Sequence, residues 1–181
     1  MDHKDQIRDQ WLVSRCQEGD VTALDELISR WQERLWRHAL RLTGNPDAAW
    51  DVLQETMIAI SRGLGRLVEP AAFPGWAYRI ATNQCRDFLR RQGRQRLSME
   101  AYFSEQLREN RRDPSPVRAM DLQAALKQLP GPQQTLVSLR YEEGFSVAEI
   151  AGILGIHLGT VKSRLHAARQ YLRTLLEEHE K

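Results

Sequence analysis

The chain has 181 residues, enough for one or two domains, and it holds no apolar run near the roughly 20 residues that cross a bilayer. Its first ten residues lack the apolar core of a signal peptide, so we expect a cytoplasmic protein without membrane insertion. Positive and negative side chains balance at 13 each over residues 1–92 and at 7 each over residues 119–181, so neither half has the strong positive field with which a DNA-binding domain works alone.

The N-terminal half begins with a helix predicted over residues 5–17, with Ile7, Trp11 and Leu12 along its apolar side. Asp20 is placed to cap a long second helix with a continuous apolar stripe. That helix ends before Pro46, because proline cannot continue the helical hydrogen bonds.

A third helix is predicted from about residue 47 to residue 62, and its outer side carries three polar side chains, Asp51, Gln54 and Glu55. The following segment, residues 63–75, is rich in glycine and proline and predicts a shaped loop. It is not a phosphate-binding GxGxxG loop, because Val68 stands where the third glycine would be.

A fourth helix is predicted over residues 76–92, and its polar side carries the cations Arg79, Arg86, Arg90 and Arg91. Two aromatic residues, Phe73 and Trp76, lie beside these arginines. Either they stack on nucleic-acid bases or they belong to the core. We favour the core for Trp76 and leave both interpretations open for Phe73.

Residues 93–116 break the apolar periodicity and end in the sequence DPSP, which indicates a polar linker. Beyond it the periodicity returns in a helix that Pro130 ends and a second helix that Pro132 opens. No alternating strand pattern competes anywhere. We therefore predict an all-α chain of two small helical domains, residues 1–92 and 119–181, joined by a flexible linker at 93–118.

The C-terminal domain contains the pattern of a helix-turn-helix. Ser146 and Glu149 have the spacing of a capping box, which starts a helix at about Val147, and Gly155 stops it. A second amphipathic run follows after Gly159, with apolar residues on one side and a basic, polar side opposite. In a helix-turn-helix, the second helix enters the DNA major groove. The alternative is an ordinary helical hairpin with a solvated cationic face, which we do not favour because the cap, the small residues and the polar face occur together.

Three stretches together resemble the extracytoplasmic-function (ECF, group IV) sigma factors of bacterial RNA polymerase: DVLQET at 51–56, FPGWAYRIATNQCRDFLRR at 73–91 and GFSVAEIAGILGIHLGTVKSRL at 144–165. The resemblance implies a region 2 domain at residues 1–92 and a region 4 domain at residues 119–181. It also implies promoter-specific transcription initiation, with core RNA polymerase (the β′ clamp helices and the β subunit) and promoter DNA as partners, and an anti-sigma factor as a regulator.

The resemblance further assigns roles to residues by position. It implies polymerase binding by Asp51, Gln54 and Glu55. It implies that region 2 reads the minus-ten element, with Asn83 at the pocket of a flipped base and the 63–75 loop shaping that pocket. It implies that Arg79, Arg86, Arg90 and Arg91 contact the backbone of the opened strand, and it assigns Phe73 to the same element. It implies that the second helix of the helix-turn-helix reads the minus-thirty-five element through Thr160, Lys162, Ser163, Arg164, His166 and Arg169.

This sequence departs from the family pattern at three positions. Trp50 stands where an acid usually precedes Asp51, His157 replaces a frequent proline in the turn, and Ala167 stands where many members carry arginine. We therefore expect the polymerase contact to differ in detail from that of other family members. The base sequence of the promoter elements does not follow from the amino-acid sequence.

No signature of catalysis occurs in the chain, since the histidines and the two cysteines lack metal-ligand spacing and there is no nucleophile elbow or Walker loop. We expect no enzyme activity, no cofactor and no metal. Two rival functions stay open from the residues alone: a one-component regulator whose first domain senses a ligand, and a protein-interaction module that sequesters another regulator. Binding of the chain to core polymerase would argue against the ligand-sensing regulator. A requirement for Lys162 and Arg164 in transcription would argue against the protein-interaction module.

Overall fold

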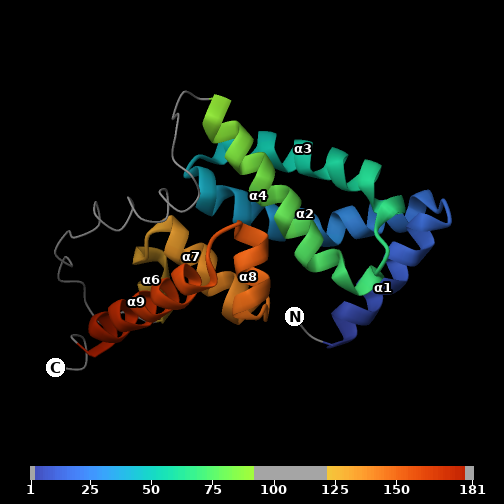
Figure 1. The fold of residues 1–181 in the computed structure, drawn as a ribbon. Helices are drawn as coiled ribbons and strands as arrows, with labels where there is room; N and C mark the ends of the chain where they lie inside the picture. Colours follow the sequence, from blue (N-terminus) through green and yellow to red (C-terminus); the bar gives the residue numbers. More distant parts are fainter. Residues whose placement is uncertain (1–2, 92–121, 178–181) are drawn as a thin grey trace. The chain divides into compact units, whose positions relative to one another are not determined.

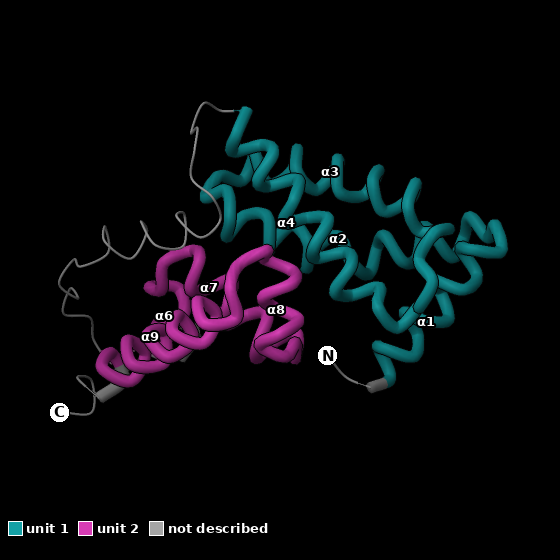
Figure 2. The backbone as a smooth tube through the Cα atoms, in the orientation of Figure 1, with its two compact units in different colours: residues 1–95 teal, residues 96–181 magenta. Residues whose placement is uncertain are grey.

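The computed structural model describes residues 3–91 and 122–177, and every secondary-structure element in these ranges is helical (Figure 1). The chain forms two compact units, residues 1–95 and residues 96–181 (Figure 2). The all-α prediction is confirmed, and the predicted linker at 93–118 lies outside the described residues. None of the described helices is long and apolar enough to span a membrane.

Unit 1 is organised around its longest helix, which packs against the other three α-helices described for this unit (Figure 1). Its elements are α1 (His3–Gln17), α2 (Val21–Thr43), α3 (Pro46–Gly63), the short 3-10 helices η1 (Leu64–Arg66) and η2 (Pro70–Ala72), and α4 (Phe73–Arg91). The long loop predicted before α4 is therefore two tight helical turns, and α4 begins three residues earlier than expected.

The ends of the helices in unit 1 are set by side chains that the sequence identifies. Asp20 accepts a hydrogen bond from the backbone N–H of Thr22 at 2.9 Å and so caps α2. At the other end of α2, Gly44 has φ 67°, the left-handed conformation that glycine adopts at least cost. Asn45 then caps α3, with Pro46 in its first turn. The predicted helix boundaries at residues 20 and 44–46 are confirmed.

The core of unit 1 centres on Trp31, which is buried between α2 and α4. The ring of Phe73 meets Trp31 edge to face, with centroids 5.1 Å apart, and Tyr78 does so at 5.9 Å. Phe73 is only 1% exposed. The interpretation of Phe73 as a base-stacking residue is therefore wrong in this fold, because its ring already fills the core and a base has no access to it.

The apolar side predicted for α1 is confirmed for Leu12 and wrong for Ile7 and Trp11. Ile7 is 54% exposed and Trp11 is 51% exposed, whereas Asp9, Leu12 and Val13 are buried. Here the Asp9 carboxylate is buried against polar partners on α2, and this rotates the apolar pair Ile7 and Trp11 toward solvent.

His38 lies in the same core, between α2 and α4. Its Nε2 is 2.9 Å from the hydroxyl of Thr82, and that hydroxyl donates to the carbonyl of Tyr78 at 2.9 Å, so the imidazole is the donor and the hydroxyl its acceptor. Burial, assisted by the positive charge of Arg41, lowers the pKa of His38 from 6.5 to about 3. The imidazole is therefore neutral in the folded unit at every physiological pH.

This buried histidine predicts acid sensitivity of unit 1. Between pH 6.5 and about 3 the unfolded chain binds a proton at His38 that the folded chain does not, so stability falls as the pH falls. We expect the wild type to lose about 2 kcal/mol of unfolding free energy between pH 7 and pH 5 from this residue, and His38→Gln to remove that part of the loss. The measurement is denaturant unfolding followed by tryptophan fluorescence, because all five tryptophans lie in unit 1. An unchanged pH slope in His38→Gln would contradict the assignment.

Unit 2 is a second helical bundle in which the longest helix again contacts the others. Its described elements are α6 (Leu122–Gln128), α7 (Gly131–Val137), the π-helical turn η3 (Ser138–Glu142), α8 (Val147–Leu154) and α9 (Leu158–Glu177). α9 packs against α6, α7 and α8. Val161, Leu165 and Ala168 form its buried side, as predicted.

The helix-turn-helix prediction is confirmed, although α9 begins at Leu158, before the predicted start after Gly159. Ser146 and Glu149 form a complete capping box at the start of α8, with the serine backbone N–H donating to the glutamate at 2.7 Å and the glutamate N–H donating to the serine hydroxyl at 3.2 Å. Gly155 ends α8 with φ 62°, in the left-handed conformation. The turn leads directly into α9, which presents its outer side to solvent.

Candidate functional site

Three separate surfaces carry the predicted contact residues, and the first is the outer side of α3. Asp51, Gln54 and Glu55 are all exposed there. They share one face because they are three and four residues apart, while the same helix buries Val52 and Leu53 on its inner side. The face therefore presents two carboxylates and an amide that take no part in the packing of the core.

An aromatic pair lies next to this polar face. Trp50 is 57% exposed, and its ring centroid is 5.7 Å from that of Trp36 on α2. The indole Nε1 of Trp36 is buried and has no hydrogen-bond partner. Trp36 was not predicted from the sequence, since one tryptophan on an amphipathic helix is indistinguishable from a core residue until the neighbouring helix is placed.

The polar face of α3 also borders a cavity at its N-terminal end. The cavity has a volume of about 290 Å³, and its lining includes Asp47, Asp51, Phe88 and Leu89. Asp51 thus lies at the edge of a depression that combines carboxylates with apolar side chains. Such a lining suits the aliphatic stem and charged end of a lysine or arginine.

The second surface is the cationic side of α4. Arg79, Asn83, Arg86 and Arg90 recur every three or four residues, so they form one stripe opposite the buried side of the helix. The Asn83 carbonyl oxygen accepts a hydrogen bond from Arg86 at 3.3 Å, and Arg90 pairs with Asp87 at 3.5 Å. The structure therefore brings the predicted minus-ten residues together, except Phe73.

The cationic stripe of α4 continues at its C-terminal end. Arg91 is exposed, and its Nε donates to the backbone carbonyl of Asp87 at 3.4 Å. A cation at this end of a helix is favoured by the helix dipole.

The loop that precedes α4 lies close to this stripe along the chain. Trp76 is half-buried, and its ring lies against Gly63, where a Cβ would come within 2.9 Å of the ring atom Cζ2. This contact supports the core interpretation of Trp76. Val68, between η1 and η2, is 97% exposed and marks the outermost point of the loop.

The third surface is the outer side of α9. Lys162, Ser163, His166 and Arg169 are exposed, and Thr160 and Arg164 are half-buried. Partial burial lowers the pKa of Arg164, which remains a cation at neutral pH. All six predicted residues therefore lie outside the buried side of α9 that Val161, Leu165 and Ala168 form.

The described residues contain no group of three or more histidine, cysteine, aspartate or glutamate side chains that holds a metal ion. Cys16 is half-buried and Cys85 is buried, and both are free thiols. Burial raises the pKa of Cys85 to about 12, so this thiol is unreactive at neutral pH. The three surfaces offer binding groups and no nucleophile activated for chemistry.

Comparison with known proteins relates both units to one family. Residues 27–95 match Sigma-70 region 2, and residues 119–172 match Sigma-70, region 4. The chain is 42% identical over 171 residues to the ECF RNA polymerase sigma factor SigE of Mycolicibacterium smegmatis, covering 89% of this chain and 65% of that protein. It is 34% identical to the RNA polymerase sigma-H factor of Pseudomonas aeruginosa, covering 95% of each.

A solved structure shares the fold. It is the sigma factor RpoE of Bartonella quintana, crystallised in complex with the anti-sigma factor NepR. The TM-score is 0.60 at 23% identity, over 87% of this chain and 98% of that one. At this identity the similarity concerns the fold alone.

Proposed function

Because this chain belongs to the ECF RNA polymerase sigma factors, with sigma-70 regions 2 and 4, we propose that its two units divide promoter recognition between them. A sigma factor directs transcription initiation and is not an enzyme. In the proposal, unit 1 binds core RNA polymerase and reads the minus-ten element. Unit 2 reads the minus-thirty-five element. This function places the chain in the cytoplasm, where polymerase meets DNA.

The polymerase contact is assigned to the outer face of α3. Asp51, Gln54 and Glu55 are available there for a basic partner surface, and the family resemblance points to the β′ clamp helices. The exposed ring of Trp50 extends this face with an apolar patch of the kind that dominates interface energetics. The β subunit is a further partner of the proposed complex.

The two DNA contacts differ in the form of DNA that they read. The stripe of α4 places Asn83 among arginines, which suits a separated strand whose phosphates need neutralising and whose flipped base needs a polar partner. The outer side of α9 suits intact duplex, since a helix of this kind fits the major groove. The family resemblance assigns Arg79, Arg86, Arg90 and Arg91 to the phosphate backbone of the opened strand, and Arg86 lies within hydrogen-bond distance of Asn83.

One observation carries the proposal. The residues that the family resemblance assigns to polymerase and to DNA occupy three exposed helical faces, with Phe73 as the exception. None of these faces is buried by packing within its own unit. A ligand-sensing domain would not require the polar face of α3 together with the cationic face of α4.

Energetics explain why a polymerase partner is needed. Opening about ten base pairs costs on the order of 10 kcal/mol or more, at roughly 1.4 kcal/mol per stacking step. One captured base and several arginine contacts each offset only a few kcal/mol of the cost of opening the duplex. The net charge of +2 supplies little additional attraction to DNA.

The experiment that tests the proposal compares the chain with and without core polymerase. We expect weak promoter binding by the free chain, and specific binding and run-off transcription once core polymerase is added. Tight, salt-resistant binding of the free chain to duplex promoter in a gel-shift assay would contradict the proposal, as would failure to associate with core polymerase.

An anti-sigma factor is proposed as the regulator of this chain. The support is the family resemblance, which implies such a regulator. Such a partner would cover one or more of the three contact faces. Competition between a candidate anti-sigma protein and core polymerase for the purified chain tests this point.

Trp50 gives a prediction specific to this sequence. We expect Trp50→Ala to weaken binding to core polymerase by about tenfold, because an exposed aromatic next to Asp51 supplies apolar contact that alanine lacks. The measurement is a titration of labelled chain with core polymerase. Trp11→Ala is the matched control, since Trp11 is 51% exposed and lies on α1. Equal affinities for Trp50→Ala and wild type would remove Trp50 from the interface.

A further inference from the structure

Helix α1 lies outside the segment that matches region 2, which begins at residue 27, yet its side chains hold the parts of unit 1 assigned to the minus-ten element. The most direct contact comes from Gln17, the last residue of α1. Its Nε2 donates to the backbone carbonyl of Leu64 at 3.0 Å and to that of Leu67 at 2.7 Å. Both amide hydrogens are therefore used, and one side chain fixes the loop before α4 at two points.

These two carbonyls lie immediately before the tip of the loop. Leu64 begins η1, and Leu67 ends it through a turn bond to Leu64 of 3.1 Å. The next residue is Val68, the outermost point of the loop at 97% exposure. Since Gln17 fixes the backbone directly before Val68, it determines the position of the tip of the loop.

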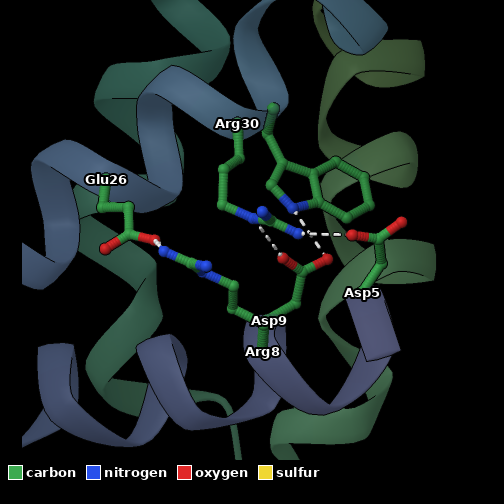
Figure 3. Close-up of polar contacts among 6 residues, drawn as sticks. Asp5, Arg8, Asp9, Glu26 and Arg30 are labelled. Carbon is green, nitrogen blue, oxygen red and sulfur yellow. Dashed lines mark hydrogen bonds and ion pairs between the residues drawn. The ribbon is translucent and has the colours of Figure 1, made fainter. Parts of the chain in front are cut away.

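A second contact from α1 reaches the start of α4 through the core. The buried Asp9 carboxylate accepts hydrogen bonds from Arg30 Nε at 3.0 Å and from Trp31 Nε1 at 3.1 Å (Figure 3). Trp31 in turn packs edge to face on Phe73, the first residue of α4. Asp9 therefore orients the indole that the first turn of α4 rests on.

Further ion pairs fix α1 along α2. Arg30 also donates to Asp5 at 3.0 Å, and Arg8 Nε donates to Glu26 at 2.8 Å (Figure 3). Burial raises the pKa of Asp9, while Arg30 and Trp31 oppose that change by favouring the carboxylate. The carboxylate is thus held by two directional donors, so α1 has one register on α2.

We propose that α1 is a brace that sets the loop of residues 64–72 and the first turn of α4 in the geometry needed to read the minus-ten element, with Gln17 as its positioning residue. The inference rests on the proposed function of unit 1. In this proposal Gln17 contacts no DNA. It acts by holding the loop that leads into α4, the helix that carries Asn83, so its effect is on discrimination between bases.

The test uses three substitutions at Gln17, which is exposed, so that unit 1 keeps its core. Gln17→Lys retains N–H donors on a long stem, Gln17→Met removes them without adding charge, and Gln17→Glu replaces them with acceptors that face two carbonyls. All are good helix formers. A matched control, Glu18→Gln, alters charge at the next exposed position.

The readout is run-off transcription by the full chain with core polymerase, on promoters that carry every single-base substitution in the minus-ten element. We expect the preference for the best base at the most discriminated position to fall about tenfold in Gln17→Met and further in Gln17→Glu, and to remain in Gln17→Lys and Glu18→Gln. Affinity for core polymerase should be unchanged in all four. A merely structural role would lower total activity and affinity for core polymerase together and would leave the preference between bases unchanged.

Parallel measurement of Asn83→Ala separates the two hypotheses. If Asn83→Ala loses base preference while Gln17→Met and Gln17→Glu keep it, the brace is refuted and the proposed function stands. If Asn83→Ala also keeps the preference, the minus-ten assignment of unit 1 is refuted, and the brace with it.

Discussion

Replacing Asp51 and Glu55 together with alanine is expected to weaken binding to core RNA polymerase by at least about 30-fold and to abolish transcription at limiting concentrations of the chain. Both carboxylates are exposed on one face of α3, so their removal leaves the core of unit 1 intact. The loss arises because a basic partner surface is left with unpaired charges in the complex. The measurement is an affinity titration of labelled chain with core polymerase, supported by run-off transcription.

The control for this prediction is a variant with the same change in charge elsewhere. Glu18→Ala combined with Asp25→Ala removes two exposed carboxylates from unit 1 outside α3, and it should bind core polymerase as the wild type does. The loss in the Asp51 and Glu55 variant should also shrink at high salt, because exposed charges are screened beyond about 8 Å at physiological ionic strength. Wild-type affinity in that variant would remove α3 from the interface.

Arg164→Ala is expected to lower initiation from promoters that depend on the minus-thirty-five element by about 5- to 150-fold, corresponding to about 1–3 kcal/mol for a lost base contact. Arg164 is half-buried on α9, so the protein covers its stem and limits the directions of its guanidinium. The same substitution should relax sequence preference within that element. Lys162→Ala should instead weaken binding evenly across sequences and reduce the salt slope by about 1, as expected for a phosphate contact.

Arg173→Ala is the matched control for α9, because Arg173 is an exposed arginine of the same helix outside the predicted contact set. It should leave both affinity and sequence preference unchanged. If Arg164→Ala behaves as Arg173→Ala does, α9 does not read DNA through this residue. The rival function as a protein-interaction module would then gain support.

The boundaries of the helices could be predicted because local chemistry decides them. Asp20, Gly44, Ser146 and Glu149 act within three or four residues of themselves, and each occupies the capping role that its residue type indicates. The exposed face of α3 was predictable for a similar reason. Its polar residues recur with the helical period, opposite a clear apolar stripe.

The errors and omissions share another cause, which is contact between distant segments. Asp9 is buried because Arg30 and Trp31, more than 20 residues away, supply its donors. His38 is buried because Thr82 accepts from it across 44 residues. Residue type alone assigns aspartate to the surface, and for histidine it leaves surface and core both open.

The same limit applies to the candidate site. Phe73 lies beside arginines in the sequence, yet its ring faces Trp31 in the core. Gln17 gives no signal of its role, since a polar residue at a helix end is ordinary and its acceptors are backbone carbonyls about 50 residues further along. The pairing of Trp50 with Trp36 likewise depends on how α2 and α3 pack.

The division of promoter recognition between the two units is tested most directly by selection from a library of random promoters with reconstituted polymerase. The wild-type chain should enrich two separate sequence blocks. Asn83→Ala should relax only the block nearer the start site, and Arg164→Ala should relax only the block further upstream. Enrichment of no sequence by the wild type, or relaxation of the same block by both variants, would contradict the division.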